Sequence, residues 1–330
     1  MPTPPPTRAA RAARRRRVAR RRRFVAIVVA VIIVVALAVG VMGFIRSLSE
    51  RDRAGTAAAA AELTAGDEKA ADSGAADADA ALAPTTTAGF DTAAAADEAL
   101  TTLADYSDAA RATEDTLYAA SERLRAATTP ESAEAALAET QAAAAAVRAD
   151  AEAYRGQLAA ASAGTNTQPT GGDVAGQLAY LHQYVFDYNS AQWGDYNPYG
   201  GDCTNFASQG LIARGWQTDR SWYSDGGMWT ASKPWIATAA MAAYFDRLGL
   251  QYSTQDDLDR VRVGDVGLFT WGETGGGMDH TMTVSKVEYV PGGPPKVFFI
   301  SHNYDGEYRE LTDALYVEHQ DSTVRIYHIP

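Results

Sequence analysis

The residue of this chain best suited to covalent chemistry is its single cysteine, Cys203. It follows the turn residues Gly200 and Gly201, and the segment after it, with Phe206 and Leu211, predicts a helix that begins at or near the cysteine. At a helix N-terminus, the dipole and the free backbone N–H groups stabilise a thiolate and can hold an oxyanion. Free cysteines are also often small buried apolar residues, and this local context leaves both interpretations open.

Candidate partners for a thiol lie in strands predicted farther along the chain. His280 stands at the start of a strand predicted at 279–287, and His302 and Asn303 end a strand predicted at 297–303. A thiol nucleophile needs a base to accept its proton, and the base needs a partner that orients it. The predicted elements would supply all three groups: the helix carries the thiol, one strand begins with the histidine, and the neighbouring strand ends in polar residues.

The motifs that carry these residues occur in a characteristic order. Gly-Gly-Asp-Cys-Thr-Asn-Phe-x-Ser-Gln at 200–209 is followed by Gly-Asp at 264–265, Asp-His-Thr at 279–281 and Ser-His-Asn-x-Asp at 301–305. This order resembles the putative amidase domain family, which belongs to the wider NlpC/P60 and CHAP group of papain-like cysteine peptidases and amidases. The resemblance extends over about residues 174–320.

The resemblance implies an α+β fold for residues 173–330. The fold would be papain-like, of the NlpC/P60 type, with a central antiparallel sheet and an N-terminal helix that carries the nucleophile. The resemblance also implies that Cys203 is the nucleophile and His280 the general base of an amidase or peptidase.

The partner that orients His280 is expected at one of two adjacent positions. The last motif of the family has a histidine three residues before an aspartate, which His302 and Asp305 match, whereas CHAP-like relatives carry an asparagine where Asn303 falls. Adjacent residues of a strand face opposite sides of the sheet, so only one of the two can reach His280. We favour His302, with Asn303 as the alternative. Gly306 stands where the family commonly has a basic residue, which departs from the pattern.

Three further residues are expected to support the reaction centre. Asn197 lies six residues before Cys203, the spacing of the oxyanion-binding amide in papain-type enzymes, although the Asn-Pro sequence also suits a turn. Asn205, just past the nucleophile, can hold the loop by side-chain hydrogen bonds. Asp202, directly before the cysteine, belongs to the same supporting group.

A zinc site made of Cys203, His280, His302 and Asp279 is an alternative use of the same residues, because all four side chains are zinc ligands in proteins. The chain has no Cys-x-x-Cys or His-x-x-x-His pair to anchor such a site. The sequence therefore predicts neither a metal nor another cofactor.

The predicted domain boundaries follow the composition. Residues 173–330 contain all six tryptophans, all five histidines and thirteen of the sixteen tyrosines, which is enough to bury a substantial core. Most of the tryptophans are expected in that core. Residues 164–172, with several glycines, an asparagine and a proline, are predicted to be a linker.

Residues 96–163 are expected to form a helical hairpin that acts as a stalk. Apolar and small residues recur at alternating spacings of three and four on both sides of Thr129 and Pro130. Thr129 suits a helix N-cap and Pro130 the first helical position, so the turn is predicted there. Such helices should pack as an antiparallel coiled coil, and an alanine-rich disordered tether is the alternative. Residues 47–95 are predicted to be a flexible linker.

The N-terminal segment has the charge and hydropathy of a membrane anchor. Residues 1–23 contain ten arginines and no acid, and residues 24–44 contain no charged side chain. An apolar helix of this length spans roughly 30 Å, the hydrocarbon thickness of a bilayer. We predict a single-pass anchor at 24–46 with a cytoplasmic N-terminus and an extracellular C-terminal domain. A cleaved signal peptide is the alternative.

The charge of the remaining chain bears on its partners. Without the ten arginines before residue 24, the formal charge changes from −12 to −22, and an acidic exterior disfavours nucleic acid. The sequence therefore predicts a membrane-anchored, extracytoplasmic cysteine amidase or peptidase that acts on a peptide or peptidoglycan-type substrate in the cell wall. A catalytically inactive binding or scaffold module on the same fold is the alternative.

Overall fold

A computed structural model describes three stretches of the chain, residues 91–227, 229–272 and 277–330. The predicted basic tail (1–23), the predicted anchor (24–46) and nearly all of the predicted linker (47–95) lie outside these stretches. In the part that the structure describes, no helix is both long enough and apolar enough to cross a membrane.

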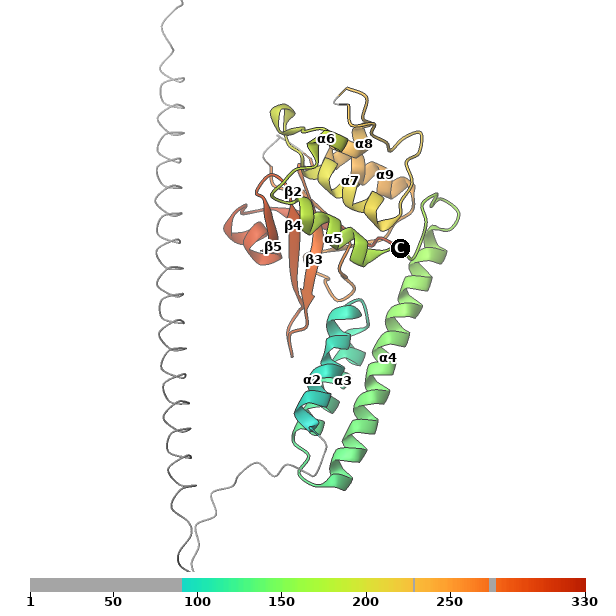
Figure 1. Cartoon of the computed structure of the whole chain (residues 1–330), viewed down its shortest axis with the longest axis vertical. Coiled ribbons are helices and arrows are strands. Elements are labelled where there is room, and N and C mark those ends of the chain that lie inside the picture. Colours follow the sequence, from blue (N-terminus) through green and yellow to red (C-terminus); the bar gives the residue numbers. More distant parts are fainter. Residues whose placement is uncertain (1–90, 228, 273–276) are drawn as a thin grey trace, which may run out of the picture. The chain divides into compact units, whose positions relative to one another are not determined.

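The described residues contain one sheet of six strands, and each neighbouring pair is antiparallel (Figure 1). The order across the sheet is β1-β6-β2-β3-β4-β5. The predicted α+β class with an antiparallel sheet is therefore confirmed. The strands are β1 (Tyr252–Thr254), β2 (Val266–Thr270), β3 (His280–Glu288), β4 (Lys296–Ser301), β5 (Gly306–Glu310) and β6 (Thr323–Tyr327).

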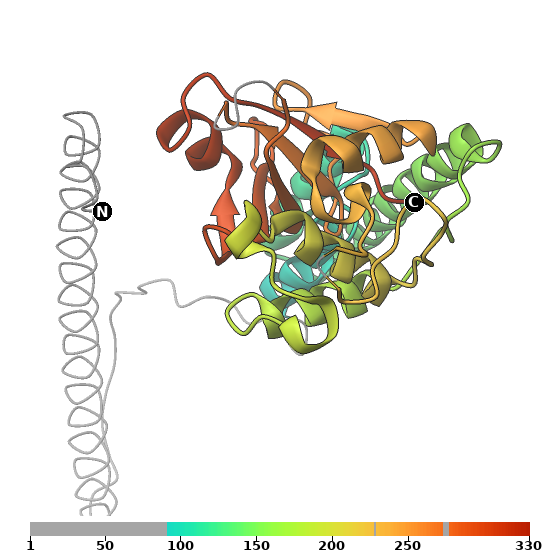
Figure 2. The ribbon, with the colours of Figure 1, turned by 90° about the horizontal axis from the view of Figure 1, so that it is seen from above.

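Helices from the middle of the chain lie along one face of this sheet (Figure 2). In that group α7 (Cys203–Arg214) contacts β3, and α9 (Thr238–Arg247) contacts β2. The shorter elements of this part are α5 (Val174–Tyr184), α6 (Ser190–Trp193), η1 (Asn197–Tyr199) and α8 (Lys233–Ile236), and a π-helical turn, η2 (Asp313–Val317), follows β5.

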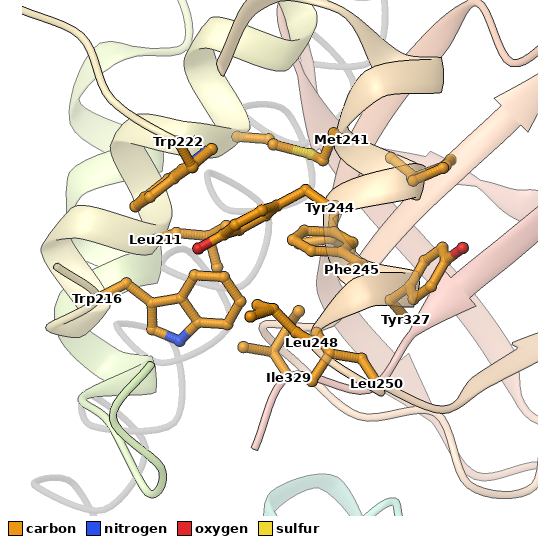
Figure 3. Packing of buried hydrophobic residues seen from close by; sticks show 14 of the residues in the cluster. Leu211, Trp216, Trp222, Met241, Tyr244, Phe245, Leu248, Leu250, Tyr327 and Ile329 are labelled. Atoms are coloured by element: carbon orange, nitrogen blue, oxygen red, sulfur yellow. The ribbon is translucent and has the colours of Figure 1, made fainter. Parts of the chain in front are cut away.

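Aromatic residues fill the core between these helices and the sheet (Figure 3). Trp216, Trp222 and Trp235 are each at most 1 % exposed. The ring of Trp222 stacks on Tyr244, with centroids 6.0 Å apart, and Leu268 of β2 closes the core from the side of the sheet. The predicted burial of tryptophan is confirmed for these three, and each large ring contributes a large apolar area to stability.

A second core lies on the opposite face of the sheet. Phe269, Met282 and Phe299 belong to it, and their neighbours along each strand face the helices, because successive side chains of a strand alternate. Thr281 accordingly contacts α7, whereas His280 pairs with Phe269 in the register of β2 and β3. The side chains of His280 and Thr281, the first two residues of β3, therefore lie on opposite faces of the sheet.

The helices before this domain differ from the predicted hairpin. The described residues form three helices there, α2 (Thr92–Asp105), α3 (Arg111–Arg125) and α4 (Pro130–Ser162). The predicted turn is confirmed, because Thr129 caps α4 and Pro130 is its first residue. Predicted seam residues such as Leu117 and Val147 are buried between the helices. The first helix of the predicted hairpin was expected to be continuous. This prediction was wrong, since α2 ends at Asp105 and α3 begins only at Arg111.

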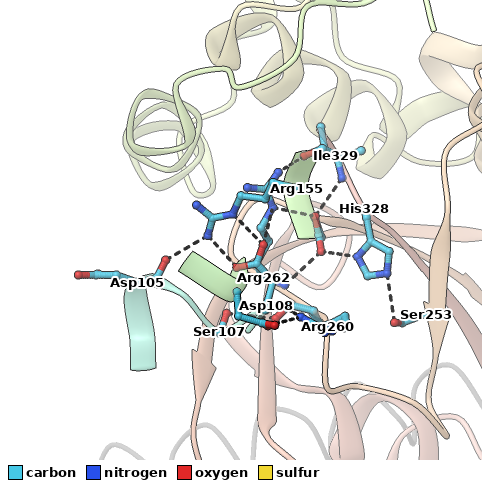
Figure 4. Close-up of polar contacts among 12 residues, drawn as sticks. Asp105, Ser107, Asp108, Arg155, Ser253, Arg260, Arg262, His328 and Ile329 are labelled. Atoms are coloured by element: carbon cyan, nitrogen blue, oxygen red, sulfur yellow. Dashed lines mark hydrogen bonds and ion pairs between the residues drawn. The ribbon is translucent and has the colours of Figure 1, made fainter. Parts of the chain in front are cut away.

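Polar contacts explain the break between α2 and α3 (Figure 4). Ser107 Oγ donates to the carbonyl of Val261 over 3.1 Å. The buried Asp108 carboxylate accepts two hydrogen bonds of 2.7 Å from the guanidinium of Arg155 on α4. These contacts hold Ser107 and Asp108 in a non-helical turn. Their partners lie far away in the sequence, so the periodicity of apolar residues does not reveal them.

Arginines dock the three helices on the sheet domain. Arg260 Nη1 donates to the carbonyl of Asp108 over 2.7 Å and to Asp150 Oδ2 over 2.8 Å, and its guanidinium lies 4.5 Å from the ring centre of Tyr154. Arg111 of α3 donates to two backbone carbonyls of the turn between β3 and β4. The helices and the sheet therefore belong to one compact unit, and the helices are not a free-standing stalk.

The segment predicted to be a linker, 164–172, is also tied to the domain. Thr165 Oγ1 donates to the carbonyl of Leu248 over 2.8 Å. Gln168 is 6 % exposed, donates to Tyr244 Oη over 2.7 Å and accepts the N–H of Gln217 over 2.9 Å. These side-chain bonds fix the path of the chain into the domain.

The Gly-Asp motif before β2 has a structural role. Asp265 is fully buried and accepts hydrogen bonds from the N–H of Arg262 (3.1 Å), from His328 Nδ1 (3.0 Å) and from the N–H of Ile329 (3.0 Å). Gly264 has a φ of +91°, and a Cβ at this position would lie 2.6 Å from Arg214 Nη1. The motif thus joins the start of β2 to the C-terminal residues.

The docked helices contain one buried acid with a predictable pH effect. Glu114 of α3 is 4 % exposed, and burial raises its pKa from 4.5 to about 8 despite the nearby Arg111. An acid whose pKa is higher in the folded than in the unfolded state binds more protons when folded, so the folded state loses stability as the pH rises from about 4.5 towards 8.

We expect Glu114→Gln to remove this loss. Its free energy of unfolding should match or exceed that of the wild type near pH 5 and exceed it on the order of 2–4 kcal/mol near pH 9, because each pKa unit corresponds to about 1.4 kcal/mol. Chemical denaturation across this pH range measures the difference. Glu122→Gln, at an exposed site of the same helix, is the control. A constant difference between Glu114→Gln and the wild type at all pH values would contradict the prediction.

Candidate active site

Cys203 is the first residue of α7 and lines a pocket of about 260 Å³. Its predicted place at a helix N-terminus is therefore confirmed. Gly200 and Gly201 lead into the helix with φ of +128° and +139°, values that side-chain-bearing residues rarely adopt. The pocket is also lined by residues of α7, α9 and the segment before β3, among them Thr204, Thr238, Met278 and Asp279.

Two exposed aromatic side chains stand at this pocket. Tyr199 lines it and is 61 % exposed, and its ring meets the ring of Trp229 edge-on with centroids 5.6 Å apart. Trp229 is 85 % exposed, so it is not among the tryptophans of the core, where most but not all of them were expected. Exposed aromatic faces of this kind provide contact area for the part of a ligand that lies outside the pocket.

The thiol of Cys203 is held in its neutral form. Burial raises the pKa of this thiol, and the charge of Asp202 acts in the same direction, whereas the backbone N–H of Thr281 and groups of Thr204 oppose the rise. The helix N-terminus alone predicts a stabilised thiolate, but loss of hydration outweighs it here. The thiol therefore needs a base to become nucleophilic.

Asp202, directly before Cys203, is the centre of a buried hydrogen-bond network. Its Oδ1 accepts the backbone N–H of Tyr196 and the Nδ2 group of Asn205, both over 3.0 Å. Its Oδ2 accepts His302 Nδ1 over 2.7 Å. Asn205 Oδ1 in turn accepts Trp235 Nε1 over 2.7 Å. The carboxylate and Asn205 thus hold the turn before α7, which is the supporting role expected for Asn205.

His302 is a partner of Asp202 and not of His280. Its Nε2 lies 3.0 Å from the carbonyl of Tyr184, so both ring nitrogens are engaged in hydrogen bonds. The ring is fully buried between Tyr188 and Phe206, at centroid distances of 3.5 and 3.6 Å. With both nitrogens engaged, His302 has no atom left to orient His280. The structure does not bring the two predicted histidines together.

His280 is the first residue of β3 and is 3 % exposed. Its backbone is next to the thiol, because the following residue, Thr281, contributes its N–H to Cys203. Its ring stacks on Trp271, with centroids 4.0 Å apart, and no hydrogen bond joins it to Cys203 among the described residues. Burial lowers the pKa of His280 well below the usual value, and the charges of Arg309 and His319 add to this effect. The imidazole is therefore neutral at rest.

The hydrogen bond that was expected to orient His280 is not formed at Nε2 of its imidazole by any described residue. Nε2 is buried without a hydrogen-bond partner in the described part of the chain. The ring is positioned by stacking instead, since Trp271 lies against it and carries His319 on its other face, with centroids 3.8 Å apart. A Trp–His stack fixes the plane of the ring but leaves the nitrogen free.

Asn303, the alternative third member, has yet another set of partners. Its Oδ1 accepts the backbone N–H of Cys203 over 2.9 Å and also that of Asp202. Its Nδ2 donates to the Oδ1 of Asn197, the residue predicted to supply the oxyanion amide. The structure therefore brings Asn197, Asp202, Cys203 and Asn303 together at the start of α7, and it leaves Asn303 without a bond to His280.

Three threonine hydroxyls hold α7 against the sheet. Thr204, Thr238 and Thr281 are mutually hydrogen bonded at 3.0–3.1 Å, so α7, α9 and β3 meet at one point. Each hydroxyl can donate once and accept once around this ring, which satisfies three buried polar groups. Thr281 thereby holds β3 against the cysteine.

The predicted alternative of a zinc site involves the same residues. Among the residues that the structure describes, no three His, Cys, Asp or Glu side chains are grouped as ligands of one metal ion. Of the four proposed ligands, His302 is engaged with Asp202, and Asp279 accepts the backbone N–H of Trp271 over 2.8 Å.

Comparison with protein families supports the motif analysis. Residues 172–327 match the family model of the putative amidase domain. This part of the chain is similar to that family. The family resemblance drawn from the motifs is thus confirmed, and the match suggests an amidase-type hydrolase. No curated protein and no solved structure matches the chain.

Sequence reasoning missed two groups of the amidase domain. Trp271 and His319 stack beside His280, but His319 has no motif around it and lies 39 positions away in the sequence. The threonine ring was missed because its members lie in three separate elements. A partial signal exists for Thr204 and Thr281, since each directly follows a predicted catalytic residue.

We expect Asp202→Asn to lower the free energy of unfolding by about 3–5 kcal/mol, because it breaks the buried pair of Asp202 and His302 and leaves the imidazole without its carboxylate partner. Denaturant unfolding measures this loss. The double variant Asp202→Asn/His302→Gln should be no less stable than Asp202→Asn, since it also removes the imidazole that has lost its partner. If the losses in the free energy of unfolding of the two single variants add up to the loss of the double variant, the two side chains do not interact.

Proposed function

We propose that the amidase domain hydrolyses an amide bond with Cys203 as the nucleophile. The observation that carries this proposal is the position of the thiol, at the N-terminus of α7 and on the wall of a pocket, in contact with the backbone beside His280. In this proposal the resting thiol and the resting imidazole are both neutral, and a proton passes between them during the reaction.

The reaction would run in two halves. The proton of Cys203 passes to the imidazole of His280 as Sγ attacks the carbonyl carbon, and the oxyanion forms beside the backbone N–H groups at the start of α7. The C–N bond then breaks, the amine leaves with the proton from His280, and a thioester remains. Water, deprotonated by His280, hydrolyses the thioester to a carboxylic acid and restores the thiol.

The stacked position of His280 is compatible with this role. No described residue bonds its Nε2, so in this proposal an entering substrate shifts the ring from its stack on Trp271 without breaking a hydrogen bond at that nitrogen. Catalytic hydrogen bonds are often long or misaligned before substrate binds. The final contact between imidazole and thiol is therefore a feature of the substrate complex in this proposal.

The substrate and location follow from the sequence. A basic tail at 1–23 and the uncharged apolar run at 24–44 support a single-pass anchor at 24–46 with the amidase domain outside the membrane. Peptide of the cell wall is the abundant amide substrate in that place. The exposed rings of Tyr199 and Trp229 beside the pocket suit a ligand that extends past the scissile bond.

A binding module without catalysis is the second candidate. Two observations favour it: no described residue bonds Nε2 of His280, and His302 is engaged elsewhere. In that case the pocket would hold a cell-wall peptide that stays intact.

Digestion of purified cell-wall material separates the two candidates. We expect the wild type to release fragments with new amine and carboxylate ends, identified by mass spectrometry. His280→Ala should slow the release by about 10²–10⁴-fold, the usual effect of losing a general base. Cys203→Ala should abolish it and also the mass shift of the acyl-enzyme, while both variants keep the melting temperature of the folded domain.

Two outcomes would overturn the enzyme proposal. One is full activity of Cys203→Ala. The other is binding of wall peptide by the wild type with no cleavage, which would establish the binding module.

A further inference from the structure

The turn between β4 and β5 inserts a side chain into the site just described. Asn303 has a φ of +58°, and the following Tyr304 has a φ of +88°, in the region that non-glycine residues rarely adopt. This backbone shape directs the Asn303 carboxamide toward Cys203, whose N–H it binds over 2.9 Å. Strained backbone of this kind persists where surrounding contacts enforce it.

The orientation of the carboxamide is determined by its partners. Two backbone N–H groups, those of Asp202 and Cys203, point at one atom, which must therefore be the oxygen, Oδ1. The amide nitrogen donates to the oxygen of Asn197. Gly201 makes room for this arrangement, since a Cβ there would lie 3.0 Å from Oδ1.

The bound carboxamide occupies the donors that catalysis would need. In acyl transfer to a cysteine at a helix N-terminus, the backbone N–H of the nucleophile is a natural donor to the developing oxyanion. That N–H and its neighbour already hold the oxygen of Asn303, so a substrate carbonyl cannot bind there at the same time.

We propose that Asn303 is an autoinhibitory plug whose carboxamide stands in for the amide of the substrate and must leave before the substrate carbonyl can bind. This inference rests on the proposed amidase function. It assigns to Asn303 a role opposite to that of a third catalytic residue, because removal of the side chain should then activate the site.

The plug can move without unfolding the site. His302 stays anchored by Asp202 and Tyr184, so the strand end keeps its place when the next residue turns away. The turn itself is held by Asp305, whose Oδ1 accepts the N–H of Asn303 over 3.0 Å and the hydroxyl of Tyr188 over 2.7 Å. These two exposed hydrogen bonds of Asp305 are the contacts within the turn that would weaken when the Asn303 side chain is displaced.

The test uses alkylation of the full-length protein, in which Cys203 is the single cysteine. Iodoacetamide carries a carbonyl that can use the vacated N–H groups, whereas 4,4′-dithiodipyridine attacks the same thiol without a carbonyl. Asn303→Gly removes the carboxamide and tolerates the positive φ. It should raise the iodoacetamide rate by about tenfold, the effect of releasing one or two hydrogen bonds of ordinary net strength, and change the disulfide-exchange rate by less than about twofold.

Asn303→Asp is the matched control, because it retains the acceptor oxygen on the N–H groups of Asp202 and Cys203. It should react with iodoacetamide as slowly as the wild type. Asn197→Ala removes only the acceptor of the Asn303 amide and should give a smaller rise than Asn303→Gly. This variant also tests the proposal if Asn303→Gly does not fold, as judged from its melting temperature.

The outcomes are distinct. A rise confined to iodoacetamide supports the plug. An equal rise with both reagents would mean that Asn303 only covers the thiol, and an unchanged or lower iodoacetamide rate would overturn the proposal outright. Since alkylation needs no turnover, a plug found in a protein that cleaves no amide would refute the proposed function alone. Cleavage that Asn303→Gly slows would refute the plug alone.

Discussion

Asp202 and His302 meet at 2.7 Å with both side chains almost wholly hidden from solvent, and three elements depend on that contact. The carboxylate holds the turn before α7, and the imidazole joins the end of β4 to the end of α5 through the carbonyl of Tyr184. Breaking a buried pair of this kind is strongly destabilising, so the contact favours the observed placement of α7 relative to β4. The position of Cys203 follows from this placement.

The same contact explains the composition of the site. Because His302 is committed to Asp202, it cannot orient His280, and the ring of His280 is instead held flat against Trp271. Because β4 ends at this anchor, the next residue, Asn303, is directed at the start of α7. Burial keeps both the thiol and His280 uncharged. The resting site is thus neutral, with its backbone donors occupied.

The helices before the amidase domain belong to the same physical unit. Asp108, buried in the break between α2 and α3, binds Arg155 through its side chain and Arg260 through its carbonyl. On the sheet side, Asp265 binds the C-terminal residues, so the Gly-Asp motif serves the fold more than the chemistry. Carboxylates buried with several donors connect parts of the chain that are distant in sequence.

The sequence by itself determined the elements whose signals are local. Thr129 and Pro130 mark the start of α4, alternation marks β2, β3 and β4, and the glycines before Cys203 mark the turn into α7. The motif order also identified the putative amidase family, because it combines residue types with their order along the chain.

Only the tertiary structure decided which side chains meet. His302, Asn303 and Asp202 have short-range surroundings that suit several roles, and the choice among them depends on which donors and acceptors are brought within 3 Å by packing. The break in the first predicted helix has the same origin, since its partners lie on α4 and near β2. Burial, which sets the protonation of Cys203 and His280, is likewise a property of the folded chain and not of the residues around them in sequence.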